Sequence, residues 1–363
     1  MRIGIISMHR VRNYGSFLQA YGLKRMLEQQ GHGVKFIDIE PSSGDTTKKS
    51  SARVWKKLRQ IDRYIWHRIQ FQKIYHASKG MFRKEQKAHL GLEDMVFTAE
   101  NCDAVVIGSD EIFNCASRGP WKITAKRFGD ISSVNRVISY AASCGYTDIT
   151  YADDTDKQVM ERGIANLHAV SVRDENTASF VANFRKDIPY RHLDPVLIYD
   201  FAEEVNRVDE SKLPLKPYMI VYAYRGRIHQ KSEIRAIRAY AKKHGLRLIS
   251  IGGMQHWCDE YVAPTPFEVL AYFKNAACIV TDTFHGTVIS AKYNKSFAVL
   301  VRESNANKLE DLLRRLQLED HAVQSAGDLA SILDRETDYT QCNDIIAQGK
   351  LCAAEYLRTS LME

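Results

Sequence analysis

A histidine, an arginine and a pair of carboxylates stand where α/β proteins commonly bind ligands. His285 follows Cys278–Thr281, a short apolar run typical of a buried strand, and a helical pattern restarts at Val288. Ligands bind at the carboxyl ends of strands in open α/β sheets, where helix starts offer free N–H groups and a positive dipole end. Gly286 lets a ligand approach the backbone closely. A lone histidine here is more simply interpreted as a helix cap, so a functional interpretation needs a second cluster.

Arg173 repeats this arrangement in the first half of the chain. It follows a strand predicted at 169–172 and precedes a helix predicted to end near Phe184. A guanidinium group at such a place can hold a carboxylate or phosphate through two parallel hydrogen bonds. An ion pair with Asp174, Glu175 or a neighbouring residue explains the same residue equally well.

A third strand end carries a hydroxyl and two carboxylates. Asp103–Ile107 has the pattern of a buried strand, and Ser109, Asp110 and Glu111 follow it. A turn and a helix cap account for these residue types. The chemical interpretation is that they hold the hydroxyl groups of a sugar.

The first strand, predicted at Ile3–Ser7, leads into a basic loop that contains His9, Arg10 and Arg12. Asn13-Tyr14-Gly15-Ser16 then opens an amphipathic helix, so this βαβ unit offers an anion site at a helix start. The dinucleotide pattern G-x-G-x-x-G is absent from it.

Composition places the chain among ordinary soluble globular proteins of two domains. It has 363 residues, 45% hydrophobic and 26% charged, and no apolar run approaches a membrane span. The seven cysteines are scattered without C-x-x-C spacing, which favours reduced thiols over disulfides or zinc. With a strand pattern directly at the N-terminus in place of a signal peptide, a cytoplasmic protein is expected. The formal charge of +7 favours anionic ligands or surfaces.

The densest positive charge of the first half lies in residues 45–90. This segment has thirteen lysines and arginines from Lys48 to Lys87 against only Asp62 and Glu85, besides Asp45 at its start, interleaved with Trp55, Trp66 and other apolar residues. An amphipathic helix packed on the first domain, with its basic face in water, is the favoured interpretation. A peripheral contact with an anionic membrane surface is the alternative. No motif supports nucleic-acid binding.

Strand and helix patterns alternate through both halves of the chain. We therefore expect an α/β fold of two Rossmann-like domains that face each other across a cleft. The expected domains are 1–205, which includes the basic excursion 45–90, and 206–340, which carries His285. Residues 341–363 are expected to form a helix that packs back on the first domain.

The sequence resembles the polysaccharide pyruvyl transferase family. The matching stretches occur in the order of the family and cover about residues 1–315; they are Asn13-Tyr14-Gly15-Ser16-Phe17-Leu18-Gln19-Ala20-Tyr21, Ile107-Gly108-Ser109-Asp110, Ile138-Ser139-Tyr140-Ala141-Ala142-Ser143, Ser171-Val172-Arg173-Asp174, Leu193-Asp194-Pro195 and Thr283-Phe284-His285-Gly286-Thr287. The first and last of these stretches together are specific for the family, and either one alone is weak evidence for it. The resemblance implies a fold similar to that of B-type glycosyltransferases.

The resemblance also implies transfer of a pyruvyl group from phosphoenolpyruvate to two sugar hydroxyls, which gives a cyclic ketal in bacterial surface polysaccharides. His285 takes the place of the general acid and Arg173 that of the donor anchor. A downstream lysine assists in some members; Lys308 is the nearest match, with Lys292 and Lys295 as alternatives. Phosphoenolpyruvate is a substrate here, and no cofactor or metal is expected.

The remaining site residues follow from the same stretches and from the chemistry. Asp110 or Glu111 is expected to orient or deprotonate a sugar hydroxyl. The other expected substrate-binding residues are Asn13, Tyr14, Gly15, Ser109, Phe284, Gly286 and Thr287.

Two other functions fit the sequence. One is a nucleotide-sugar-dependent glycosyltransferase of the same fold, and the other is a non-catalytic binding protein at the membrane surface. Under the favoured function the partners are phosphoenolpyruvate and a sugar acceptor, for which the basic segment favours a lipid-linked carrier at the inner face of the cell membrane.

Overall fold

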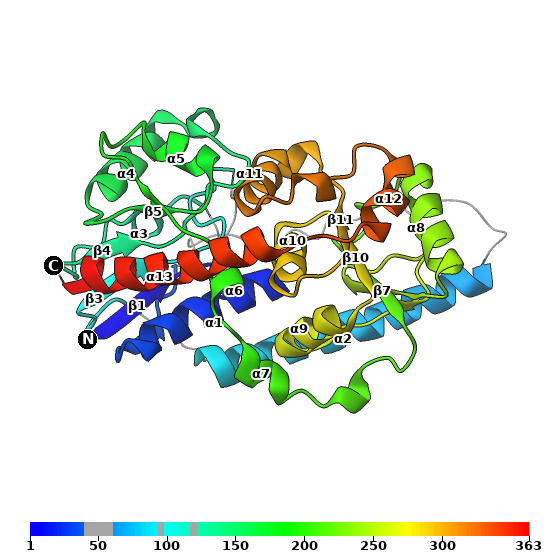
Figure 1. Cartoon of the computed structure of the whole chain (residues 1–363). Coiled ribbons are helices and arrows are strands. Elements are labelled where there is room, and N and C mark those ends of the chain that lie inside the picture. The colour runs from blue at the N-terminus through cyan, green and yellow to red at the C-terminus, as the bar shows by residue number, and fades with distance from the viewer. Residues whose placement is uncertain (40–60, 93–97, 117–121, 363) are drawn as a thin grey trace.

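The computed structural model describes residues 1–39, 61–92, 98–116 and 122–362, and two parallel β-sheets form its framework (Figure 1). Helices cover the sheets, so the α/β class expected from the sequence is confirmed. The predicted basic segment 45–90 lies partly outside the described residues, which resume at 61.

The first sheet has the strand order β2-β1-β3-β4, with all neighbours parallel. Its strands are β1 (Arg2–Ile6), β2 (Gly33–Phe36), β3 (Ala104–Ile107) and β4 (Val137–Ser139), and the parallel pair β5 (Ser171–Val172) and β6 (Tyr190–Arg191) continues it beyond β4. Every residue of β3 is buried, and alternate residues belong to two different core clusters. Both faces of this sheet are therefore covered, as the continuous apolar run of β3 indicates.

The second sheet has the order β11-β10-β7-β8-β9 and is also fully parallel. Its strands are β7 (Tyr218–Ala223), β8 (Arg247–Gly252), β9 (Glu260–Tyr261), β10 (Cys278–Thr281) and β11 (Phe297–Val299). In β7, Ile220 faces the same core cluster as Ile5 of β1, while Val221 faces a separate outer cluster. One hydrophobic core is thus shared between the two sheets.

The helices connect the strands within each half. They are α1 (Tyr14–Gln29), α2 (Ile61–Leu90), α3 (Ala125–Phe128), α4 (Asp154–Ala165), α5 (Glu175–Val181), α6 (Pro195–Ile198), α7 (Ala202–Asn206), α8 (Lys231–Lys243), α9 (Pro266–Asn275), α10 (Phe284–Lys292), α11 (Ala306–Leu316), α12 (Leu329–Asp334) and α13 (Thr340–Met362), with short 3-10 turns at η2 (Ile149–Tyr151), η3 (Glu210–Lys212), η4 (Glu303–Asn305), η5 (Glu319–His321) and η6 (Ala326–Asp328).

Helix α2, the described part of the basic segment, packs against both halves of the molecule. The ring of Phe82 lies 5.0 Å from that of Tyr14 on α1, and the ring of His89 lies 4.9 Å from that of Phe267 on α9. In Figure 1 α2 runs beside α9 toward the second sheet. Three basic side chains near its end, Arg83, Lys84 and Lys87, are exposed. The packed amphipathic helix favoured above describes this part of α2, and membrane contact stays a prediction.

Helix α13 returns from the second half to the first sheet (Figure 1). The hydroxyl of Tyr356 donates a hydrogen bond of 2.7 Å to the carbonyl of Ser139 in β4, and Arg136 donates one of 3.1 Å to the carbonyl of Ser360. The chain thus crosses between the halves twice, and the domain limits at 205 and 340 stay a prediction.

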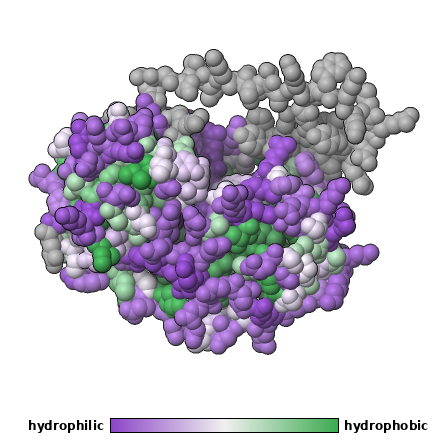
Figure 2. Space-filling model, turned by 90° about the horizontal axis from the view of Figure 1, so that it is seen from above, coloured by the Kyte–Doolittle hydropathy of each residue, from purple (hydrophilic) through white to green (hydrophobic). Residues whose placement is uncertain are grey.

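The face of the molecule seen in Figure 2 is mainly hydrophilic, with hydrophobic residues in small patches. Within the described residues, no helix is both long enough and apolar enough to cross a bilayer. The same residues contain no group of three or more His, Cys, Asp and Glu side chains placed to hold a metal ion.

Candidate active site

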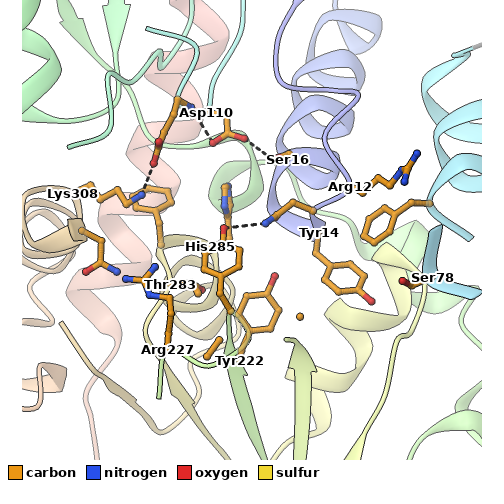
Figure 3. A pocket seen from close by; sticks show the side chains of 18 of the residues that line it. Arg12, Tyr14, Ser16, Ser78, Asp110, Tyr222, Arg227, Thr283, His285 and Lys308 are labelled. Carbon is orange, nitrogen blue, oxygen red and sulfur yellow. Dashed lines mark hydrogen bonds and ion pairs between the residues drawn. The ribbon is translucent and has the colours of Figure 1, made fainter. Parts of the chain in front are cut away.

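A cleft between the two sheets gathers most of the predicted site residues. Its cavity has a volume of about 260 Å³. The lining comes from the start of α1, the C-terminal part of α2, the ends of β3 and β7, the start of α10 and the residues before and within α11 (Figure 3). The carboxyl ends of strands from both sheets therefore open on one site, as expected for this architecture.

His285 stands in the first turn of α10, which begins at Phe284, four residues earlier than the helical pattern from Val288 indicates. The side chain of Thr283 caps this helix by accepting a hydrogen bond of 3.0 Å from the amide of Gly286. The imidazole reaches across to Gly15 on α1: a Cβ atom built on Gly15 would lie only 2.0 Å from Nδ1 of His285. The absence of a side chain at Gly15 therefore allows this histidine to pack closely against α1.

Asp194 connects the histidine to the arginine singled out in the first half. Its Oδ2 atom accepts a hydrogen bond of 2.9 Å from Arg173 and one of 3.0 Å from the hydroxyl of Ser109, and it lies 3.5 Å from Nε2 of His285. Its Oδ1 atom accepts from the amide of Val196 and so caps α6. Burial raises the pKa of Asp194, but His285, Arg173 and the Val196 amide outweigh it and hold that pKa well below its ordinary value.

Arg173 is only 3% exposed, and its guanidinium lies over the ring of Phe284 at 4.0 Å from the ring centroid. Burial lowers the pKa of Arg173, but the carboxylates of Asp194, Asp110 and Asp174 raise it above the ordinary value. The ion pair anticipated with Asp174 is long, at 4.0 Å, and the short one is with Asp194.

Lys308 on α11 crosses the cleft to Glu111, with 2.5 Å between Nζ and Oε1. The other carboxylate oxygen of Glu111 accepts a hydrogen bond of 2.9 Å from Asn114. Burial raises the pKa of Glu111, but Lys308, Arg173 and Asn114 together lower it below its ordinary value. Glu111 is therefore an ionised partner of Lys308.

The two alternative lysines lie away from the cleft. Lys292 donates hydrogen bonds to the carbonyls of Leu197 and Tyr199, and burial lowers its pKa to about 8. Lys295 donates to the carbonyl of Lys274. Among the three candidates, only Lys308 lines the cleft.

Asp110 has a left-handed backbone, with φ of 79°, at the end of β3. Its Oδ2 atom accepts a hydrogen bond of 2.6 Å from the hydroxyl of Ser16, and its Oδ1 atom accepts one of 3.0 Å from the amide of Glu111. A left-handed backbone at a non-glycine residue is uncommon, and here two hydrogen bonds fix the side chain beside the start of α1.

Asn13 and Tyr14 tie the start of α1 to the second half. The amide of Asn13 donates a hydrogen bond of 3.0 Å to the hydroxyl of Tyr224, while its carbonyl oxygen caps α1 by accepting from Gly15. The hydroxyl of Tyr14 donates one of 2.8 Å to the carbonyl of Pro264. Both residues line the cleft and also hold its two sides together.

Three predicted substrate-binding residues lie behind the cleft surface. Ser109 is fully buried and donates to Asp194. A Cβ atom on Gly286 would lie 2.1 Å from the hydroxyl of Thr281, so this glycine allows α10 to pack on its own strand. Thr287 is buried, and its hydroxyl donates to the carbonyl of Thr283. These three residues position the site from behind.

Sequence reasoning missed Asp194 as a functional residue, and it missed Arg227. Nε of Arg227 lies 3.1 Å from the fully buried carboxylate of Asp282, and its terminal nitrogen donates to the hydroxyl of Ser304. Burial raises the pKa of Asp282 to about 6, although Arg227 and Arg302 act in the opposite direction. A weaker signal was present, since Arg227 lies four residues after β7, whereas Arg173 directly follows β5.

Aromatic side chains form the rest of the lining. They are Tyr14, Phe82, Tyr222, Tyr224, Tyr261 and Phe284. A cleft with a histidine beside a buried carboxylate, several cations and aromatic walls suits an anionic substrate and a partner with apolar faces.

Solved structures with a similar fold include a UDP-GlcNAc 2-epimerase, a protein solved with UDP and one solved with quercetin. The UDP-GlcNAc 2-epimerase of Methanocaldococcus jannaschii has 10% identity and a TM-score of 0.55, with 99% of each chain covered. MnaA of S. aureus, solved with UDP, has 13% identity and a TM-score of 0.53, covering 98% of this chain and 94% of its own. UGT89C1 of Arabidopsis thaliana, solved with quercetin, has 11% identity and a TM-score of 0.52, covering 100% and 99%. At such identities the likeness shows the fold alone, and it confirms the B-type glycosyltransferase architecture.

No curated protein sequence matches this chain. The model of one family, however, matches residues 13–304, a stretch that includes Asn13, Asp110, Arg173, Asp194 and His285 and leaves Lys308 just outside. This match covers most of the chain and both sides of the cleft. The chain therefore belongs to the polysaccharide pyruvyl transferase family.

Proposed function

We propose that this protein transfers the pyruvyl group of phosphoenolpyruvate to two hydroxyls of a sugar and forms a cyclic ketal during the synthesis of a surface polysaccharide. Family membership supports the reaction class. The observation that carries the assignment is the placement of His285 between Gly15 and Asp194, with Arg173 on the same carboxylate.

Phosphoenolpyruvate carries a carboxylate and a phosphate, about three negative charges at neutral pH. Arg173, Arg227 and Lys308 line the cleft on the donor side in this proposal. Arg173 and Lys308 already pair with Asp194 and Glu111, so the donor shares these cations with the carboxylates. Such fixed donors stabilise charge without reorganisation during the reaction.

The first step is protonation of the methylene carbon of the donor. Nε2 of His285 is buried toward Asp194, which leaves Nδ1 to deliver the proton. The negative charge of Asp194 stabilises the imidazolium before transfer. The new C–H bond forms at the methylene carbon, the C=C bond breaks, and positive charge develops at C2.

A sugar hydroxyl then adds to C2, and Asp110 accepts its proton. The C2–O bond to phosphate breaks, phosphate leaves, and the second hydroxyl closes the ketal at C2. One hydroxyl proton returns to His285 through Asp110, and the other leaves with phosphate, so the protein ends in its starting state. Glu111 keeps Lys308 in place beside the leaving phosphate, since the two residues form a close ion pair.

Thermal stability in the presence of phosphoenolpyruvate tests the donor, because a ligand that binds only the folded state raises the unfolding temperature. We expect phosphoenolpyruvate to raise it in the wild type and to raise it much less in Arg227→Ala. Arg227 is preferable to Arg173 for this test, because Arg227 is partly exposed and the pKa of its partner Asp282 is raised to about 6. Arg173 and its ionised partner Asp194, in contrast, are both buried.

Phosphate release tests the reaction. We expect release from phosphoenolpyruvate to require both the sugar acceptor and His285. If UDP raised the unfolding temperature and phosphoenolpyruvate did not, the protein would be a nucleotide-dependent glycosyltransferase and the proposed function would be wrong.

A further inference from the structure

Helix α11 belongs to the second half of the molecule but presents a charged face to the first. Three side chains at helical spacing, Lys308, Asp311 and Arg315, all bind residues of the first half. The apolar side of the helix lies in the core shared by the two sheets, through Leu309, Leu312, Leu313 and Leu316. The helix is therefore fixed by its own core on one side and by the first half on the other.

Arg315 holds the backbone of Arg173. Its Nη1 atom donates a hydrogen bond of 2.6 Å to the carbonyl oxygen of Arg173. The side chain of the preceding residue, Arg314, is 66% exposed and lies 3.6 Å from Asp311. Hydrogen bonds from a charged donor are among the stronger ones in proteins. Arg315 thus fixes the backbone from which the guanidinium of Arg173 extends into the cleft.

Asp311 holds the middle of the same helix to β6. Its two carboxylate oxygens accept hydrogen bonds of 2.8 and 3.0 Å from Arg191, and Asp311 is only 4% exposed. Arg191 also donates one of 2.6 Å to Glu175 on α5. In Figure 1 α11 lies beside α5. The position of α11 against the first half is therefore set at more than one point.

Lys308 stands on the same face of α11 and lines the cleft. Seven residues separate it from Arg315, which is about 10 Å along a helix axis. The two cations that hold the donor in the proposed function, Arg173 and Lys308, come from different halves of the chain. Through Arg315, one helix connects them and sets how far apart they lie.

This spacing matters for a ligand with two anionic groups. Phosphoenolpyruvate carries its carboxylate and its phosphate on the same carbon atom, so the distance between the two charges is short and nearly fixed. When two cations match that distance, the second group binds at a high effective concentration, and a mismatch loses this gain. A ligand with a single anionic group needs no such match.

We infer that Arg315 is a positioning residue, whose bond to Arg173 sets the spacing at which Arg173 and Lys308 bind one molecule of phosphoenolpyruvate together. This inference rests on the proposed function, because it takes Arg173 and Lys308 as the two anchors of the donor. Arg315 itself does not line the cleft. It acts on the donor only through Arg173.

Calorimetry on the full chain, with phosphoenolpyruvate and inorganic phosphate as separate ligands, tests the inference. Arg315→Met should weaken the binding of phosphoenolpyruvate by about tenfold or more, because its two anionic groups no longer bind together. The affinity for inorganic phosphate should change by no more than about twofold. Arg315→Lys should recover most of the loss, since an ammonium group can still donate to the carbonyl of Arg173. A general loss of structure would weaken both ligands alike, so the ratio of the two affinities separates positioning from stability.

Arg314→Met is the matched control, because it removes the same charge from the adjacent, exposed position. It should leave both affinities within about twofold of the wild type. If Arg315→Met does not fold, Arg315→Gln replaces it, because the shorter amide does not reach the carbonyl of Arg173 and should cause the same loss.

Unchanged affinity for phosphoenolpyruvate in a folded Arg315 variant that lacks this bond would overturn the inference. So would an equal loss for phosphoenolpyruvate and inorganic phosphate, or a wild type that binds both equally tightly. A wild type that does not bind phosphoenolpyruvate at all would instead contradict the proposed function, so the two failures are distinguishable.

Discussion

The imidazole of His285 and the backbone of Gly15 lie in such close contact that a Cβ atom on Gly15 would be 2.0 Å from Nδ1. The two residues belong to α10 and α1, on opposite sides of the cleft. Position 15 therefore sets the place of the proposed general acid, although it contributes no side chain.

Gly15→Ala should lower kcat by about 100-fold or more, because the histidine must move away from its proposed place beside the donor. Stability should change little, since alanine also favours the helix by up to about 1 kcal/mol. Gly80→Ala is the matched control: Gly80 lies in α2 with nothing within 4 Å of a built Cβ. It should raise stability slightly and leave turnover unchanged. Normal turnover in Gly15→Ala would show that His285 need not stay where it lies.

Asp194→Asn should lower kcat more than it raises KM for phosphoenolpyruvate, because the amide no longer stabilises the imidazolium of His285. The alkaline limb of the activity profile should move to lower pH, since a proton donor without its counter-charge loses its proton more readily. Rates measured from pH 5 to 9 check this. An alkaline limb that does not move would mean that Asp194 serves Arg173 and α6 alone.

Asp194 should also make the free energy of unfolding depend on pH. Its pKa in the folded protein lies below the ordinary value, so it contributes stability at neutral pH that is lost only as the pH falls into the acid range. Urea unfolding of the wild type should therefore show an acid-dependent loss, and the loss should be smaller in Asp194→Asn.

Asp282→Asn should raise stability at alkaline pH. Burial raises the pKa of Asp282 to about 6, above the ordinary 3.8, so the folded state binds this proton more tightly than the unfolded chain. Stability from this group is present at low pH and is lost as the pH rises through about 6. The asparagine variant avoids that loss, by up to about 3 kcal/mol at pH 8.

Urea unfolding at pH 5 and pH 8 measures the effect, with Glu336→Gln as a control for the loss of one exposed carboxylate. The affinity for phosphoenolpyruvate should hold or rise in Asp282→Asn, because Arg227 is released from its buried ion pair. A stability gain that is the same at both pH values would contradict the assigned titration.

Substitutions of Glu111 and Lys308 distinguish two roles for the carboxylate of Glu111. If Glu111 only holds Lys308, Glu111→Gln should leave turnover within about tenfold and bind phosphoenolpyruvate as tightly or more so, because Lys308 is released from its ion pair. Lys308→Met should weaken donor binding. Loss of turnover in Glu111→Gln with donor binding intact would make Glu111, rather than Asp110, the base.

The architecture and the positions of the strand ends could be predicted from the sequence, because apolar runs and the residues that follow them are local signals. The sequence placed His285, Arg173 and Asp110 correctly at such ends, and the structure brings all three to one cleft. The onset of α10 was predicted too late because the cap is Thr283, inside the motif itself.

Contacts between residues that lie far apart in the sequence could not be predicted in this way. In the sequence Asp194 is only the middle residue of the stretch Leu193-Asp194-Pro195. In the structure it caps α6, and only packing brings its second oxygen to Arg173 and His285. Ser109 and Gly286 looked exposed to a ligand because a strand end does not reveal which side chains turn inward. Charge and aromatic content showed that 45–90 is basic, but they gave no sign that Phe82 and Lys79 reach the cleft.

The return of α13 to the first sheet has a consequence for how the molecule forms during translation. The contacts of Tyr356 with Ser139 and of Arg136 with Ser360 join the first sheet to residues that follow nearly everything else in the chain. A ribosome adds residues at about 5–20 per second, so the first sheet waits many seconds for its last covering helix. Until then the surface that α13 covers stays open, and a chaperone that binds exposed apolar chain would have that interval in which to act.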